Sequence, residues 1–149
     1  MQWVNPQNGN INIAPANTLA PGMSKAEVIA VCDTIGIEAP SDWERKPQTL
    51  VLRSVPAKEG KLYICIRFSD VDKLNRIDVV IEELNGYSTR SLLKEEQMDF
   101  YTTLLSPSFI NDAKKSAQAL LFDWGNVSFQ PDPHTDVRWL VIHYWEEIM

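Results

Sequence analysis

Residues 61–68 read KLYICIRF, and their side chains alternate between two kinds. Successive residues of a β-strand point to opposite faces of the sheet, so this pattern predicts a strand with two unlike faces. The first face is apolar throughout and contains Leu62, Ile64, Ile66 and Phe68. The second face contains Tyr63, Cys65 and Arg67. One face is therefore expected in a hydrophobic core and the other on a wetter surface.

The same alternation returns after a short polar turn at residues 69–73. Residues 76–83 read RIDVVIEE. This pattern places Ile77, Val79 and Ile81 on one face of a strand and Asp78, Val80 and Glu82 on the other. Two strands of matched length at short spacing predict an antiparallel meander with one wet face. Residues 48–55 are rich in strand-forming side chains and predict a further strand. As an edge strand it could pair with a second copy to give a homodimer, but no residue requires this.

The clearest helix signal starts at Ser24. Its hydroxyl can accept from the backbone N–H of Glu27, whose side chain can reach back to the Ser24 N–H, and this is a capping box. An apolar face at helical spacing follows: Val28, Val31, Cys32 and Ile35. A second helical region is predicted to open at Ser91, and a third to run from Ser106-Pro107 to Leu121.

The chain closes with the richest aromatic segment of the sequence. Residues 121–129 read LFDWGNVSF and residues 137–145 read VRWLVIHYW, with a polar turn between them. We expect the end of a helix, a break at Trp124-Gly125, and then a two-strand hairpin. Trp124 is interpreted as a core residue. His143 is interpreted as a partly buried, hydrogen-bonded core histidine, since its neighbours are apolar.

The predicted order of elements defines a fold class. Strands outnumber helices, and the helices are expected to pack on one face of a mostly antiparallel sheet. This is an α+β fold, a two-layer sandwich, expected to form a single domain over residues 1–149. Cys32 and Cys65 lie in a helical and a strand pattern, so we interpret both as buried apolar residues.

The charge and composition of the chain limit the class of molecule that it is expected to bind. The formal net charge is −6, which disfavours a nucleic-acid binder, because such proteins usually present a basic face. A basic protein partner is compatible with this charge, as is a simple contribution to solubility. The N-terminal residues show no signal peptide, and no apolar run approaches the length of a membrane span. Cytoplasmic location without membrane association is the expectation.

The sequence shows no set of residues for catalysis, a cofactor or a metal. The two histidines and two cysteines lack metal-ligand spacing. Nucleophile-elbow and phosphate-binding glycine motifs are absent. Asp132, His134 and Asp136 lie close together, but turns are commonly built from such residues.

Acidic pairs such as Glu95-Glu96 are poor acid–base pairs, because adjacent side chains diverge. If an acidic patch binds a partner, Asp78 and Glu82 are the best candidates, because alternation places them on the same strand face. The turn residues Asp132, His134 and Asp136 are the second candidate contact.

Short motifs spread over most of the chain carry a family resemblance. They are INI at residues 11–13, LAPGMSKAE at 19–27, WGNV at 124–127, DP at 132–133 and IHY at 142–144. In these motifs the chain resembles small, mostly uncharacterised bacterial immunity proteins of polymorphic toxin systems. The resemblance implies a stoichiometric inhibitor that binds one partner toxin in the producing cell. The helix start followed by strands is also similar to outer-membrane assembly lipoproteins and β-lactamase inhibitory proteins.

Two functional hypotheses follow. The first is a non-enzymatic binding protein, most concretely a cytoplasmic immunity protein against a basic cognate toxin. The second is a small-ligand-binding or enzymatic α+β protein, with a pocket between sheet and helices near Trp139, His143 and Tyr144. The second hypothesis rests on the polar-tipped aromatics of one predicted strand.

Overall fold

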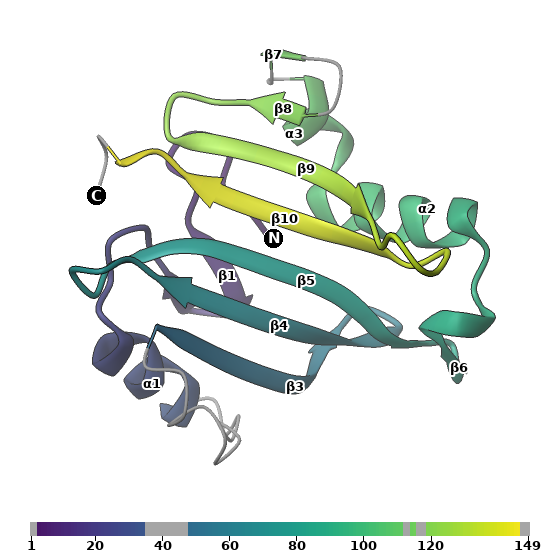
Figure 1. Cartoon of the computed structure of the whole chain (residues 1–149), viewed down its shortest axis with the longest axis horizontal. Helices are drawn as coiled ribbons and strands as arrows, with labels where there is room; N and C mark the ends of the chain where they lie inside the picture. Colours follow the sequence, from purple (N-terminus) through teal and green to yellow (C-terminus); the bar gives the residue numbers. More distant parts are fainter. Residues whose placement is uncertain (1–2, 35–47, 112–113, 116–118, 147–149) are drawn as a thin grey trace.

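The fold is built on a large antiparallel sheet, seen here in a computed structural model of the chain (Figure 1). The structure describes residues 3–34, 48–111, 114–115 and 119–146. The elements are β1 (Ile11–Ala14), β2 (Asn17–Leu19), α1 (Lys25–Thr34), β3 (Thr49–Ala57), β4 (Gly60–Phe68), β5 (Leu74–Leu84), β6 (Tyr87–Ser88), a 3-10 helix (Thr89–Ser91), α2 (Lys94–Leu105), α3 (Pro107–Asn111), β7 (Lys114–Lys115), β8 (Ala119–Leu121), β9 (Gly125–Pro131) and β10 (Arg138–Tyr144).

The strand order of the large sheet is β3-β4-β5-β10-β9-β8-β7, and the short β6 pairs with the end of β5. The predicted meander is confirmed as β4 and β5, and the predicted closing hairpin as β9 and β10. The two halves of the chain meet where β10 pairs with β5, with Leu140 opposite Val79 and Ile142 opposite Ile77. This long-range pairing makes one sheet from segments far apart in the sequence.

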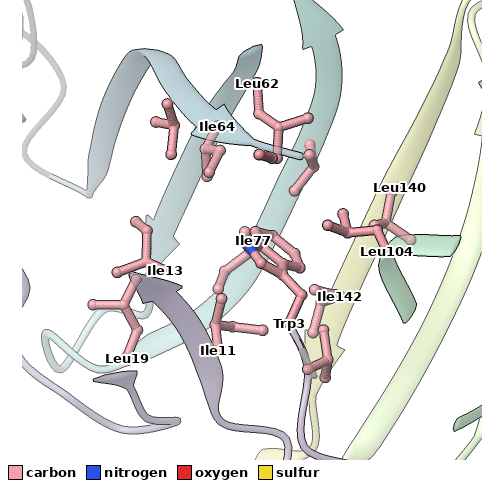
Figure 2. Packing of buried hydrophobic residues seen from close by; sticks show 14 of the residues in the cluster. Trp3, Ile11, Ile13, Leu19, Leu62, Ile64, Ile77, Leu104, Leu140 and Ile142 are labelled. Carbon is pink, nitrogen blue, oxygen red and sulfur yellow. The ribbon is translucent and has the colours of Figure 1, made fainter. Parts of the chain in front are cut away.

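The helices and the small β1–β2 sheet lie behind the large sheet in the view of Figure 1. Figure 2 shows how the N-terminal hairpin packs there, with Trp3 and Ile11 against Ile77 and Ile142. The apolar face predicted for residues 61–68 is confirmed, because Leu62, Ile64, Ile66 and Phe68 are all buried in this core. The predicted α+β class, with helices on one face of the sheet, is therefore confirmed.

The predicted capping box at the start of α1 is confirmed. Ser24 Oγ accepts from the Glu27 N–H at 3.2 Å, and Glu27 Oε1 accepts from the Ser24 N–H at 3.0 Å. We expect Ser24→Ala to lower the free energy of unfolding by about 1 kcal/mol in urea denaturation, because an N–H at the helix start loses its acceptor. The matched control is Ser91→Ala, which should change it by less than about 0.5 kcal/mol. Equal effects of the two substitutions would contradict the capping role.

Two helix predictions need correction. The second helix begins at Lys94 rather than near Ser91. At its start, Glu96 Oε1 accepts a hydrogen bond from the Leu93 N–H at 3.0 Å. The third begins at Pro107 as predicted, but it ends at Asn111. Residues predicted to continue it form β8, which pairs with β9 and brings Leu120 into the core from an extended backbone. Residues 119–121 are extended because their backbone pairs with β9, although their apolar residues have helical spacing. Ala113 and Ala117 of the predicted helix lie outside the described residues.

Both cysteines are free and buried, as predicted. Burial raises the pKa of the Cys32 thiol from 9.0 to about 11, and the neighbouring Asp33 adds to this shift. Burial also raises the pKa values of the Tyr101 and Tyr144 phenols above their ordinary value of 10.0. In each case the unfolded chain releases its proton at a lower pH than the folded chain does.

Stability is therefore expected to fall with rising pH, because the unfolded state then binds fewer protons than the folded state. We expect the free energy of unfolding, measured by urea denaturation, to fall as the pH rises from about 9 toward 11, the range between the unfolded and folded pKa values of Cys32. Tyr144→Phe removes one of the titrating groups and should flatten the fall. A stability that does not change over this range would contradict the expectation.

The edge strand β3 occupies the position expected for residues 48–55. Its pairing with β4 is interrupted by a bulge between Leu52 and Val55, where Ser54 adopts a φ of 54°. Pro56 lacks an N–H and cannot donate to a neighbouring strand. Bulges and prolines are devices that limit pairing at a sheet edge. The homodimer through this strand stays a prediction.

Candidate binding face

The side of the large sheet opposite the helices forms a continuous surface, which we call the open face. Its central row runs across five paired strands: Val51, Cys65, Asp78, Val141 and Ser128. These side chains alternate with the core residues of the same strands. The wet face predicted for β4 and β5 is confirmed in part, and the same side of the sheet continues onto β3, β10 and β9. Tyr63, Arg67, Arg76 and Glu82 reach solvent. Cys65, Asp78, Val80, Val141 and Ser128 are buried among their neighbours.

Two arginines and one aspartate form the charged centre of the open face. Arg67 and Arg76 are direct cross-strand partners, an arrangement of like charges that is destabilising by itself. Asp78 offsets it, because its Oδ1 accepts from Arg76 Nε at 2.7 Å and its Oδ2 accepts from Arg67 Nε at 3.1 Å. The Asp78 side chain is only 8% exposed, while those of Arg67 and Arg76 are 52% and 39% exposed. The trio thus presents guanidinium groups to solvent over a buried carboxylate.

Aromatic side chains lie beside this charged centre. Tyr63 and Trp139 meet edge to face, with ring centroids 6.2 Å apart and planes at 83°. The guanidinium carbon of Arg53 lies 5.7 Å from the Tyr63 ring centroid, within reach of a cation–π contact. Tyr63 and Trp139 are both half-buried, so part of each aromatic surface faces solvent.

The charged centre and the aromatic pair line one hollow of about 460 Å³. The turn between β9 and β10 forms another part of its wall. The lining is shared by β3, β4, β5, β9, β10 and that turn: Thr49, Val51, Tyr63, Cys65, Arg67, Arg76, Asp78, Gln130, Pro131, Asp132, Pro133, Trp139 and Val141. Side chains from five strands and one turn therefore converge on the hollow.

Helix α2 fixes the β9–β10 turn in place. Gln97 is fully buried, its Nε2 donates to the Asp136 carbonyl at 3.2 Å, and its Oε1 accepts from the Arg138 N–H at 2.8 Å. Within the turn, Asp132 Oδ1 accepts from the His134 N–H at 2.8 Å. The turn that borders the hollow is thus held from the core side by a buried amide.

The five predicted contact residues occupy different places. Asp78 and Asp132 line the hollow, and Asp78 is buried beneath its two arginines. Glu82 is half-buried and accepts from the Ser54 hydroxyl at 2.9 Å. His134 and Asp136 are exposed on the β9–β10 turn and do not line the hollow. Among the residues that the structure describes, no group of three or more histidine, cysteine or acidic side chains could hold a metal ion.

The interpretation of His143 as a core residue is wrong. His143 is exposed on the open side of β10, where its ring meets that of Trp145 edge to face at 6.2 Å. Its apolar sequence neighbours Ile142 and Tyr144 point to the other side of the strand and are buried. The neighbours that motivated the interpretation, Val141, Trp139 and Trp145, do share the face of His143. Only Val141 is buried, while the two tryptophans are half-buried, so this part of the face is not enclosed in a core.

The predicted pocket between sheet and helices near Trp139, His143 and Tyr144 also needs correction. Strand alternation separates Tyr144 from the other two residues, and Tyr144 donates to the Gly9 carbonyl at 2.7 Å inside the core. Trp139 lines the hollow, which lies on the open face. The three side chains therefore do not share one pocket.

Sequence reasoning missed Arg67 and Arg76 as site residues. Alternation already placed Arg67 on the wetter face of its strand, on the same side as Tyr63. What it lacked was the register of β4 against β5, which places Arg67 opposite Arg76 and both beside Asp78. Charged residues on the same face of neighbouring predicted strands are the sequence signal from which this charged centre could have been predicted.

Comparison with known proteins identifies a shared fold. No protein-family model and no curated protein matches the chain. A chain from the solved structure of Rhs1-CT in complex with cognate immunity protein RhsI1 is similar, with a TM-score of 0.58 and 16% sequence identity. The similarity covers 97% of this chain and 87% of that chain. The fold is therefore common to both chains.

The described part of the chain contains no helix with the length and apolar character needed to cross a membrane.

Proposed function

We propose that this chain is the immunity member of a toxin–immunity pair, which binds one toxin in a 1:1 complex and blocks it. The observation that carries this proposal is the similarity, over nearly the whole chain, to a protein from the complex of Rhs1-CT with its immunity protein. The family resemblance of the sequence motifs supports the same function independently. We place this action in the cytoplasm of the producing cell.

The open face is the proposed toxin-binding surface. Hot spots of protein interfaces are enriched in tryptophan, tyrosine and arginine, and Trp139, Tyr63, Arg67 and Arg76 all line the hollow. These side chains project from paired strands, so little backbone conformational entropy remains to be lost when a partner binds. A rigid sheet with an aromatic and guanidinium centre is suited to tight, stoichiometric binding rather than to turnover.

The acidic charge of the chain supports a basic toxin. A net charge of −6 attracts a cationic partner at long range and speeds association. Glu82, Asp132, His134 and Asp136 are proposed contacts at the margin of the interface. Asp78 is proposed to act through Arg67 and Arg76, since its own carboxylate is buried beneath them.

Co-expression tests the proposal. Under this proposal, the partner is the C-terminal domain of a toxin whose gene lies beside the gene for this chain. We expect that domain alone to arrest bacterial growth and the pair to grow normally, and we expect the two purified proteins to elute together at a 1:1 ratio. Growth arrest caused by this chain alone, or separate elution of the two proteins, would contradict the assignment.

A further inference from the structure

We propose that the hollow on the open face accepts an acidic side chain of the toxin between Arg67 and Arg76, with an apolar residue of the toxin packed on Trp139. This inference rests on the proposed function and names the chemistry of its contact. The net charge of the chain suggests a basic toxin, but at this one contact the toxin is proposed to present an acidic group.

The hydrogen-bonding capacity of the arginines is the first argument. Each guanidinium has five N–H donors in a planar fork, and each gives its Nε donor to Asp78. Within the described part of the chain, both guanidinium groups have Asp78 as their only side-chain partner. The terminal amino groups of both arginines are thus available at the edge of the hollow, and a carboxylate is the group that matches such donors best.

The position of Asp78 is the second argument. A buried carboxylate beneath two guanidinium groups fixes their orientation before a partner arrives, which lowers the entropic cost of binding. It neutralises only one of the two positive charges, so the trio keeps a net charge of +1. The site is therefore both preorganised and cationic.

The surrounding charges also favour an anion at this half of the open face. Arg53 adds a third exposed guanidinium beside Tyr63. Two further carboxylates face this region: Glu82, which accepts from Ser54, and Asp132, which accepts from the His134 N–H at the opposite wall of the hollow. Each acidic side chain already has a donor, whereas the arginines keep donors in excess.

The apolar side of the hollow supplies the second part of the contact. Trp139 and Val141 lie on β10, directly beside the strand that carries Arg76 and Asp78. A toxin segment with a glutamate or aspartate next to an aliphatic or aromatic residue would satisfy both walls at once. The guanidinium groups of Arg67 and Arg76 would provide specificity for that segment. The indole of Trp139 would provide most of the buried apolar area.

Calorimetric titration of the purified toxin domain tests the inference. Arg67→Gln and Arg76→Gln remove one positive charge each and leave the other arginine on Asp78, so the sheet should stay folded. We expect each substitution to weaken toxin binding roughly tenfold or more. Arg90→Gln is the matched control, because Arg90 is an exposed arginine outside the hollow, and it should bind within about twofold of wild type.

A charge exchange makes the contact specific. Arg76→Glu should abolish binding, and one Asp→Lys or Glu→Lys substitution in the toxin should restore it only with that variant. Wild-type affinity in folded Arg67→Gln and Arg76→Gln would overturn the inference and leave the proposed function intact. A toxin domain that fails to bind the wild-type chain would overturn both.

Discussion

Trp139→Ala is expected to weaken toxin binding by about 30-fold or more, the loss typical of a central tryptophan hot spot of roughly 2 kcal/mol. Trp139 lies between the arginine pair and the β9–β10 turn, where a partner seated in the hollow must cover it. Removing the indole deletes the largest apolar contact and also leaves Tyr63 without its edge-to-face partner at 6.2 Å. Isothermal titration with the toxin domain measures the change.

Thermal unfolding accompanies this titration, because loss of an aromatic pair costs only about 0.5–1.5 kcal/mol of stability and should leave Trp139→Ala folded. The matched control is Tyr87→Ala. Tyr87 is an aromatic residue with 63% exposure that does not line the hollow, and its removal should leave affinity within about twofold of wild type. An unchanged affinity for a folded Trp139→Ala would contradict binding through the open face.

Trp124→Ala is expected to lower the free energy of unfolding by about 3–5 kcal/mol, a large part of the 5–15 kcal/mol typical of a domain. Trp124 is 3% exposed and stacks on Phe122 with ring centroids 4.8 Å apart. Its Nε1 donates to the Pro6 carbonyl at 2.9 Å, and the backbone at Gly9 approaches the ring so closely that a Cβ there would lie 2.5 Å away. The indole thus joins the closing hairpin to the N-terminal segment.

Urea denaturation measures this loss, and hydrogen exchange locates it. In Trp124→Ala we expect faster exchange of the Gly9 amide, which donates to the Asn5 carbonyl at 2.8 Å, because the turn loses the ring it packs against. Trp124→Phe keeps an aromatic ring but removes the Nε1 donor, so it should cost only about 1–3 kcal/mol. A loss below about 1 kcal/mol for Trp124→Ala would show that Trp124 is not the core residue proposed.

Sequence patterns predicted β4 and β5 and the orientation of their side chains well. Alternation in β4 and β5 assigned each side chain to the correct face, and the Ser24–Glu27 capping box placed the start of α1. Both signals are local, since strand periodicity and caps involve only neighbouring residues. The prediction of one domain over residues 1–149 stays a prediction.

Patterns failed where pairing across the chain decides the structure. Residues 119–121 carry a helical spacing of apolar side chains, yet pairing with β9 makes them a strand. His143 shares a strand face with Trp139, Val141 and Trp145, yet it is exposed on that face. The candidate site shows the same limit, because the contact of Arg67 and Arg76 with Asp78 depends on strand register, which periodicity does not specify.

The structure of the purified complex between this chain and its proposed toxin partner tests binding through the open face most directly. We expect the toxin to cover the open face and bury Trp139 and Tyr63, with a toxin carboxylate within hydrogen-bond distance of Arg67 or Arg76. A toxin seated on α1, α2 or the β1–β2 hairpin, with the open face left free, would contradict it.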